Sequence, residues 1–242
     1  MIPMQPFSTW LAQAEQHHRQ TGRPLVSLCY AQSLDGCLTA RRGQPTALSG
    51  PESLSFTHWL RASHDALLAG VGTVLADDPL LTVRLVEGKN PQPVILDSRL
   101  LTPPQARLLT RHHTPAWIAT AQDVYAERHV ALQSDGARLL HLPLDSSDHL
   151  SLPHLLDCLG RMGIRRLMVE GGAQVITSFL AQGLADLCAM TIVPRFLGGL
   201  HAVETTGGPA FPSLTLPELC EIHYHRLGDD MIIMGKLTRL SH

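Results

Sequence analysis

The chain has 242 residues, is 44% hydrophobic and 17% charged, and carries a net charge of −2. That length suits one large globular domain, or a domain with small additions. The weak charge balance excludes a strongly basic nucleic-acid-binding surface and a polybasic membrane-binding surface. The N-terminus shows no signal peptide, and no apolar run approaches the ~20 residues of a membrane span, so a cytoplasmic protein is expected.

Cysteine and histidine usage gives no sign of a metal centre. The five cysteines include no Cys-x-x-Cys pair, and the fourteen histidines form no His-Glu-x-x-His or similar spacing. An odd number of cysteines without a pairing pattern indicates neither a disulfide framework nor a zinc site. We therefore expect no bound metal.

Apolar residues at helical spacing predict a first helix over residues 6–20, packed on the outside, with Ser8 or Thr9 as its cap. The segment Thr21–Pro24 ends this helix. Residues 25–31 are apolar at nearly every position, which predicts a strand covered on both faces, as in the middle of a sheet with helices on each side.

A capping box predicts the start of the next helix. Ser49 is placed as the N-cap, Pro51 lies near the start, and Glu52 follows three residues after the serine. The helix is expected to run to about Ala62. Arg61, near its C-terminal end, would compensate the negative end of the helix dipole.

The most informative stretch runs from Gly70 to Arg84, directly after an apolar run at 66–69 that predicts a buried strand. Gly70 and Gly72 let the backbone turn tightly or let a ligand lie against it. An ordinary loop has the same composition. A dinucleotide fingerprint of the Gly-x-Gly-x-x-Gly type fails, because Leu75 stands where the third glycine is required.

Strands alternate with helices over the rest of the chain, which is typical of parallel crossovers in an α/β sheet. We expect strands at 93–97, 115–120, 137–141 and 185–193, helices at 122–129 and 151–163, and a C-terminal antiparallel hairpin made by 219–227 and 231–237.

A second glycine bend follows a buried strand at 167–169. Glu170 stands at the carboxyl end of that strand, and Gly171 and Gly172 lead into a helix expected at 173–182. The free N–H groups and the dipole of a helix start favour an anion such as a diphosphate. A plain strand-to-helix loop is the other reading, since a glycine pair is ordinary there.

Three motifs together resemble one known family. The run from Gly72 to Arg84 reads Gly-Thr-Val-Leu-Ala-Asp-Asp-Pro-Leu-Leu-Thr-Val-Arg, the segment Ala31–Gly36 reads Ala-Gln-Ser-Leu-Asp-Gly, and Val169-Glu-Gly-Gly forms the third. They resemble the reductase domain of riboflavin biosynthesis, and the similarity extends over most of the chain after the first helix. The resemblance implies a dihydrofolate-reductase-like α/β fold, a mostly parallel sheet with helices on both faces and a C-terminal antiparallel hairpin. It predicts an N-terminal helical extension at 1–22 and a reductase-like domain at 23–242.

The resemblance also implies an activity: reduction of a phosphoribosylamino-pyrimidine, or a related pyrimidine or pterin substrate, with NADPH as hydride donor, by a homodimer. It implies catalytic roles for Asp77 and Glu170. Arg61 then has a second reading as a substrate contact, weighed equally with its dipole role. The substrate contacts implied are Arg61, Leu81, Arg84 and Glu170, and the cofactor contacts are Thr73, Asp77, Ser98, Gly171, Gly172, Ala173, Gln174, Val175, Ile176, Thr177 and Ser178.

Three positions depart from the family pattern. Cys29 stands where a lysine is common, Pro45 where a substrate-contacting serine is expected, and Ala47 where an aromatic residue is expected beside the nicotinamide. The His-x-Glu and Pro-Cys-x-x-Cys signature of the deaminase fused to many relatives is absent as well. The three substitutions at Cys29, Pro45 and Ala47 keep a second hypothesis open, an NADPH-binding homologue with a diverged substrate or without riboflavin-pathway activity.

Overall fold

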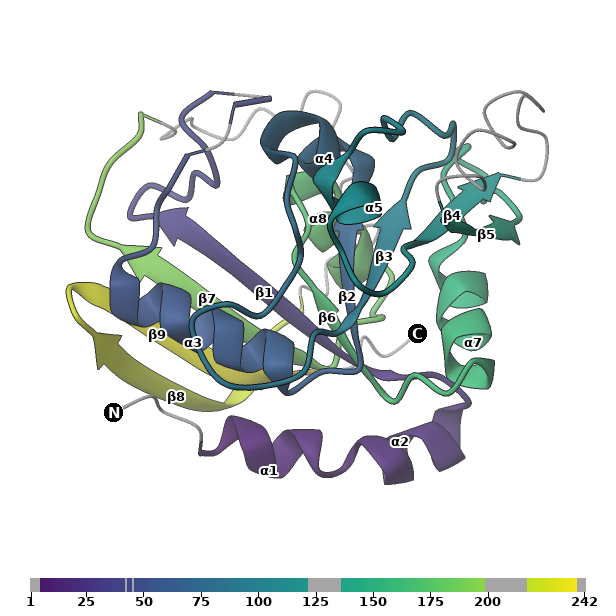
Figure 1. Ribbon diagram of the computed structural model, residues 1–242. Helices are drawn as coiled ribbons and strands as arrows, with labels where there is room; N and C mark the ends of the chain where they lie inside the picture. The colour runs from purple at the N-terminus through teal and green to yellow at the C-terminus, as the bar shows by residue number, and fades with distance from the viewer. Residues whose placement is uncertain (1–4, 42, 45, 122–135, 199–216, 239–242) are drawn as a thin grey trace.

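The computed structural model describes residues 5–41, 43–44, 46–121, 136–198 and 217–238, and these residues form one nine-stranded sheet (Figure 1). The strand order is β5-β4-β3-β2-β6-β1-β7-β9-β8. Strands β1 to β7 pair with one another in parallel, whereas β9 is antiparallel to β7, and β8 is antiparallel to β9. The strands are β1 Leu25–Ser33, β2 Ala66–Gly70, β3 Gln92–Leu96, β4 Trp117–Ala121, β5 Arg138–Leu142, β6 Arg166–Val169, β7 Leu187–Val193, β8 Leu219–Leu227 and β9 Asp230–Leu237.

Helices cover both faces of this sheet and bury two separate cores. The first core takes side chains from α1, α3, α4 and α5, and the second takes them from α7 and α8. The predicted architecture, a mostly parallel sheet with helices on both faces and a C-terminal antiparallel hairpin, is confirmed. The helices are α1 Phe7–Leu11, α2 Ala14–Thr21, α3 Pro51–Ala62, α4 Val71–Asp77, α5 Arg107–Thr110, α7 Leu152–Arg161 and α8 Ala173–Ala181.

The N-terminal segment corrects one prediction. The chain forms two short helices, α1 and α2, in place of one helix over 6–20. The N-cap of α1 is Pro6 and has no side-chain cap, so neither Ser8 nor Thr9 caps it. The Thr9 hydroxyl donates instead to Oε1 of Gln5 at 2.7 Å. The apolar spacing was read correctly, because Phe7 and Trp10 are buried against the sheet.

The cap of α3 is a second correction. The N-cap residue is Gly50, not Ser49, and no side chain of the expected box caps it. Instead, the carboxylate of Asp230, from the other end of the sequence, caps this helix. Its Oδ2 accepts the Gly50 N–H at 2.8 Å and the Ser53 hydroxyl at 2.6 Å. A carboxylate beside the positive end of a helix is favourable, and here it joins the C-terminal hairpin to α3.

The predicted strands are all found within a few residues of their expected bounds. The helix expected at 122–129 and the departure at Pro45 lie outside the described residues. Within the described ranges, none of the helices combines the length and apolar character needed to cross a membrane.

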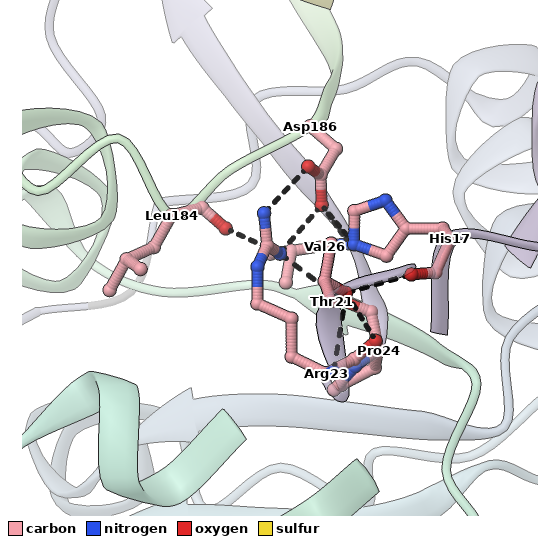
Figure 2. A network of polar contacts seen from close by, with 7 residues as sticks. All are labelled: His17, Thr21, Arg23, Pro24, Val26, Leu184 and Asp186. Carbon is pink, nitrogen blue, oxygen red and sulfur yellow. Dashed lines mark hydrogen bonds and ion pairs between the residues drawn. The ribbon is translucent and has the colours of Figure 1, made fainter. Parts of the chain in front are cut away.

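The amino-terminal edge of the sheet is closed by a polar network (Figure 2). Arg23 donates from Nη1 and Nη2 to the two carboxylate oxygens of Asp186, each at 2.8 Å. The same carboxylate accepts the N–H of Val26 at 2.9 Å, and Nε2 of His17 lies 3.7 Å from it. Arg23 also donates to the Leu184 carbonyl at 3.3 Å. The network thereby joins α2, the start of β1 and the approach to β7.

Candidate active site at the carboxyl edge

The two glycine bends predicted from sequence lie side by side at the carboxyl edge. Strand β2 ends at Gly70 and leads into α4, while β6 leads through two glycines into α8. The two strands pair in parallel, with Leu68 opposite Val169, so their carboxyl ends meet at one edge (Figure 1). A Cβ atom on Gly70 would lie 3.1 Å from Cγ2 of Val175 in α8. In an open α/β sheet, this edge is where ligands bind.

The start of α8 is open in a way that suits an anion. A Cβ on Gly171 would come within 2.6 Å of the Val175 Cβ, so glycine is needed there for packing. A Cβ on Gly172 would meet nothing within 4 Å. Gly172 is the N-cap and has no side-chain cap, and the next two residues, Ala173 and Gln174, are exposed. The first amides of the helix therefore face accessible space.

The paired aspartates at the end of α4 have different surroundings. Asp78 is the C-cap with φ +40°, and its Oδ1 accepts the Arg107 N–H at 2.8 Å. Asp77 is the last residue of α4 and is exposed, although partial burial of its carboxyl raises its pKa. Asp78 therefore has a structural role, and Asp77 presents its carboxyl to solvent. Thr73 is half-buried on the same helix.

Arg61 and Glu170 form a two-pronged ion pair between α3 and the end of β6. Nε and Nη2 of Arg61 donate to Oε1 and Oε2 of Glu170, each at 2.6 Å. Nη1 donates to the Thr82 carbonyl at 3.0 Å. Burial alone would lower the pKa of Arg61, but the Glu170 carboxylate raises it above its usual value. The arginine is thus a fixed cation, and both carboxylate oxygens of Glu170 are engaged.

A second arginine is held beside this pair. Nη1 of Arg84 donates to the Thr82 hydroxyl at 3.0 Å, so Thr82 contacts one arginine through its carbonyl and the other through its side chain. The Arg84 main-chain N–H donates to Nδ1 of His58 at 2.9 Å. Partial burial of the guanidinium first, and then the charge of Arg61, lowers the pKa of Arg84. Arg84 itself is exposed, so excess positive charge faces solvent here.

Cys29 borders the ion pair from the middle of β1. Burial, and then the charge of Glu170, raises the pKa of its thiol well above the ordinary value. The side chain is therefore neutral at the position where the motif resemblance leads us to expect a lysine, and Arg61 is the cation that pairs with Glu170. Ala47, the second departure within the described residues, is exposed, and its carbonyl accepts a hydrogen bond from Arg195 at 3.3 Å.

Other expected contacts are less accessible. The side chain of Leu81 is 2% exposed and belongs to the first core, so a ligand can reach only its main chain, which has φ +54°. Ile176 is likewise in the second core. Val175, Thr177, Ser178 and Ser98 are half-buried. Asp97, beside Ser98, is fully buried, and its carboxylate accepts the N–H groups of Leu101 and Thr102 and the Thr102 hydroxyl.

Sequence reasoning missed His58 and Thr82. Thr82 is inside the quoted motif but was given no role. His58 stands three residues before Arg61 on α3, and that spacing places two side chains on one helix face. The spacing was the available signal for His58. Its contact with Arg84, 26 residues away, requires the fold.

Comparison with known proteins decides the family. The family model for the RibD C-terminal domain matches residues 24–233. The chain belongs to this family. This confirms the family resemblance read from the three motifs, and the family is one of reductases, which implies a nicotinamide cofactor.

The chain spans different shares of the length of individual members of the RibD C-terminal domain family. A 2,5-diamino-6-ribosylamino-4(3H)-pyrimidinone 5′-phosphate reductase from Methanothermobacter thermautotrophicus is 35% identical over 215 residues, 87% of this chain and 97% of that protein. Riboflavin biosynthesis protein RibD from Bacillus amyloliquefaciens is 34% identical, and the match covers 93% of this chain but 59% of RibD. Among solved structures, Acinetobacter baumannii RibD superposes with a TM-score of 0.77 at 26% identity, over 96% of this chain and 63% of that one.

Proposed function

We propose that this protein reduces a phosphoribosylamino-pyrimidine of riboflavin biosynthesis with NADPH. One observation carries the proposal: the open start of α8 lies next to the Gly70 turn, and Glu170, directly before that start, is joined to Arg61. An anion-binding helix start and a cationic substrate side thus share one edge of the sheet. The names of the reductases that match nearly their full length support the same substrate class.

The residues present fit a nicotinamide dinucleotide. Gly172 leaves room for a diphosphate against the first amides of α8, where the helix dipole favours negative charge. We assign Thr73, Asp77 and Ser98 to the rest of the nucleotide, together with the first two turns of α8. When bound, the cofactor supplies a hydride to the ribosyl C1′ carbon, and the protein supplies position and charge.

The substrate side is built for an anion next to a buried ion pair. Arg84 is exposed and would contact a phosphate or pyrimidine oxygen, whereas the Arg61 fork is occupied by Glu170. Glu170, held by Arg61 directly before the glycine bend, would orient the reacting end of the substrate. Arg61 binds both oxygens of the carboxylate, so Glu170 is kept in place without leaving a buried charge unpaired.

The competing hypothesis is a homologue that binds NADPH but no longer acts on a riboflavin precursor. It is favoured by Cys29 and Ala47, because both lie on the expected substrate side. Titration of NADPH fluorescence, with and without substrate, separates the two functions. The substrates to test are 2,5-diamino-6-ribosylamino-4(3H)-pyrimidinone 5′-phosphate and 5-amino-6-(5-phosphoribosylamino)uracil, named in relatives and in a solved structure. Oxidation with either supports reduction, whereas binding without oxidation supports the competing hypothesis.

We also propose a homodimer, formed through the part of the sheet that none of the described helices covers. On the face that bears α7 and α8, Tyr30, Met190, Ile233 and Tyr224 line up across β1, β7, β9 and β8. Tyr224 is 63% and Met231 49% exposed, a large apolar exposure for neighbouring residues on one sheet. Sedimentation should give a dimer for the wild type and a monomer for Tyr224→Glu/Met231→Glu. A monomeric wild type would contradict the proposal.

A further inference from the structure

His58 is a buried polar residue that no assigned role explains. It lies on α3, is 0% exposed, and accepts the main-chain N–H of Arg84 with Nδ1 at 2.9 Å. Because that donor is a backbone amide, Nδ1 must carry the lone pair and the ring proton must be on Nε2. Nε2 is itself buried and has no hydrogen-bond partner among the described residues.

An imidazole with one orphaned nitrogen is poorly suited to a purely packing role. An apolar side chain of similar size would fill the same space without a buried unpartnered N–H, which costs stability. What the imidazole adds is an acceptor for Arg84. Burial, and then the nearby Arg61 and Arg84 charges, lowers the pKa of His58 to about 4. The ring is therefore neutral at physiological pH, and Nδ1 is always available as an acceptor.

The contact belongs to a continuous set that holds two arginines together. His58 and Arg61 are three residues apart on α3. His58 binds the main chain of Arg84, Arg61 binds the carbonyl of Thr82, and the Thr82 hydroxyl binds the Arg84 guanidinium. One helical turn of α3 thereby fixes the segment that carries Arg84 at two points, two residues apart.

We propose that His58 is a positioning residue that holds Arg84 against the Arg61–Glu170 pair for substrate binding. Thr82 is the second member of this support. The inference rests on the proposed function, because it assigns Arg84 to the substrate. The inference predicts that removing the His58 acceptor raises the substrate KM and leaves kcat and NADPH binding little changed.

The test compares three variants. His58→Leu keeps the volume and removes the acceptor. His58→Asn places Oδ1 at the position of Nδ1 and restores it. His64→Leu removes a different buried histidine just beyond the same helix, which contacts Leu60 and Ser27 away from Arg84. Substrate KM, kcat, NADPH affinity and hydrogen exchange of the Arg84 amide are measured for each.

We expect His58→Leu to raise substrate KM at least tenfold, with kcat within about threefold, and to lose exchange protection at the Arg84 amide. His58→Asn should recover both the KM and the protection. His64→Leu should lower the melting temperature without changing KM. Equal KM for His58→Leu and wild type, or equal damage in the Leu and Asn variants, would overturn the inference while leaving the proposed function intact. A wild type that neither binds nor reduces the pyrimidine would overturn the proposed function itself.

Discussion

The two edges of the sheet contain nearly the same ion pair with different surroundings. At the amino edge, the side chains of Arg23 and Asp186 are 17% and 12% exposed, and at the carboxyl edge those of Arg61 and Glu170 are 12% and 17% exposed. Both arginines bind both carboxylate oxygens. Asp186 is surrounded by partners that join structural elements, whereas Glu170 borders an open glycine bend and an exposed Arg84. The two pairs have the same chemistry and nearly the same exposure, so these properties do not distinguish their roles. We distinguish them by the end of the strands at which each pair lies.

The largest expected effect comes from removing the carboxylate of each pair. Asp186→Ala and Glu170→Ala each leave a buried arginine unpaired, which should lower the free energy of unfolding by about 3 kcal/mol. Only Glu170→Ala should also lose turnover. Urea unfolding and NADPH-oxidation rates at a temperature where both variants stay folded provide the measurements. Normal turnover in Glu170→Ala, or a changed substrate KM in Asp186→Ala, would break the comparison.

The next effect separates the two neighbouring aspartates of α4. Asp77→Ala should reduce turnover on the order of 100-fold, about 2.7 kcal/mol of lost transition-state stabilisation, because we assign its carboxyl to the cofactor. The melting temperature should be unchanged, because the residue is exposed. Asp78→Asn is the matched control, since asparagine tolerates the positive φ and can still accept from Arg107. An unaffected rate in Asp77→Ala would reject its role.

These edges show what the sequence could and could not predict. The strands were found because apolar runs and glycine boundaries are local signals, as in the apolar run at 25–31 and in the run at 66–69 that ends at Gly70. The cap predicted for α3 was wrong because its capping carboxylate belongs to a distant residue: Asp230, 180 residues from Gly50, accepts the Gly50 N–H. The Arg61–Glu170 pair spans 109 residues, and no local pattern specifies it. The motifs did predict that both members lie near one site, since each follows from a matched family position.

A smaller effect concerns stability and pH. His64 is buried at the amino side of the sheet, where its ring nitrogens contact the Leu60 carbonyl and the Ser27 hydroxyl. Burial lowers its pKa to about 4. The unfolded chain binds this proton below about pH 6.5 and the folded chain only near pH 4, so stability is lost as pH falls through that interval. Between pH 7.5 and 5, the His64 contribution to the free energy of unfolding should fall by about 2 kcal/mol.

Urea unfolding at both pH values, for the wild type and His64→Gln, measures that contribution. The variant should start less stable at pH 7.5 and lose less on acidification. An identical pH dependence in the two proteins would show that His64 does not titrate as described.

The smallest expected effect tests the glycine bend itself. A Cβ on Gly172 meets no protein atom within 4 Å, and the residue has φ −69°, so Gly172→Ala should fold normally. If a diphosphate lies there, the methyl group should weaken NADPH binding about tenfold, or about 1.4 kcal/mol. Gly72→Ala, on α4, adds a methyl group that also meets no protein atom but lies at the other glycine bend, so the two variants together show which bend the diphosphate contacts. Fluorescence titration of both variants with NADPH gives the answer, and unchanged affinity in Gly172→Ala would place the diphosphate elsewhere.

The most direct test is a crystal structure with NADPH bound. We predict that the diphosphate lies against the first amides of α8, beside Gly172, and that the nicotinamide reaches the edge bounded by Glu170 and the Gly70 turn. A nucleotide bound at the amino edge beside Asp186, or on either face of the sheet away from both glycine bends, would contradict the central claim that these bends form one cofactor site.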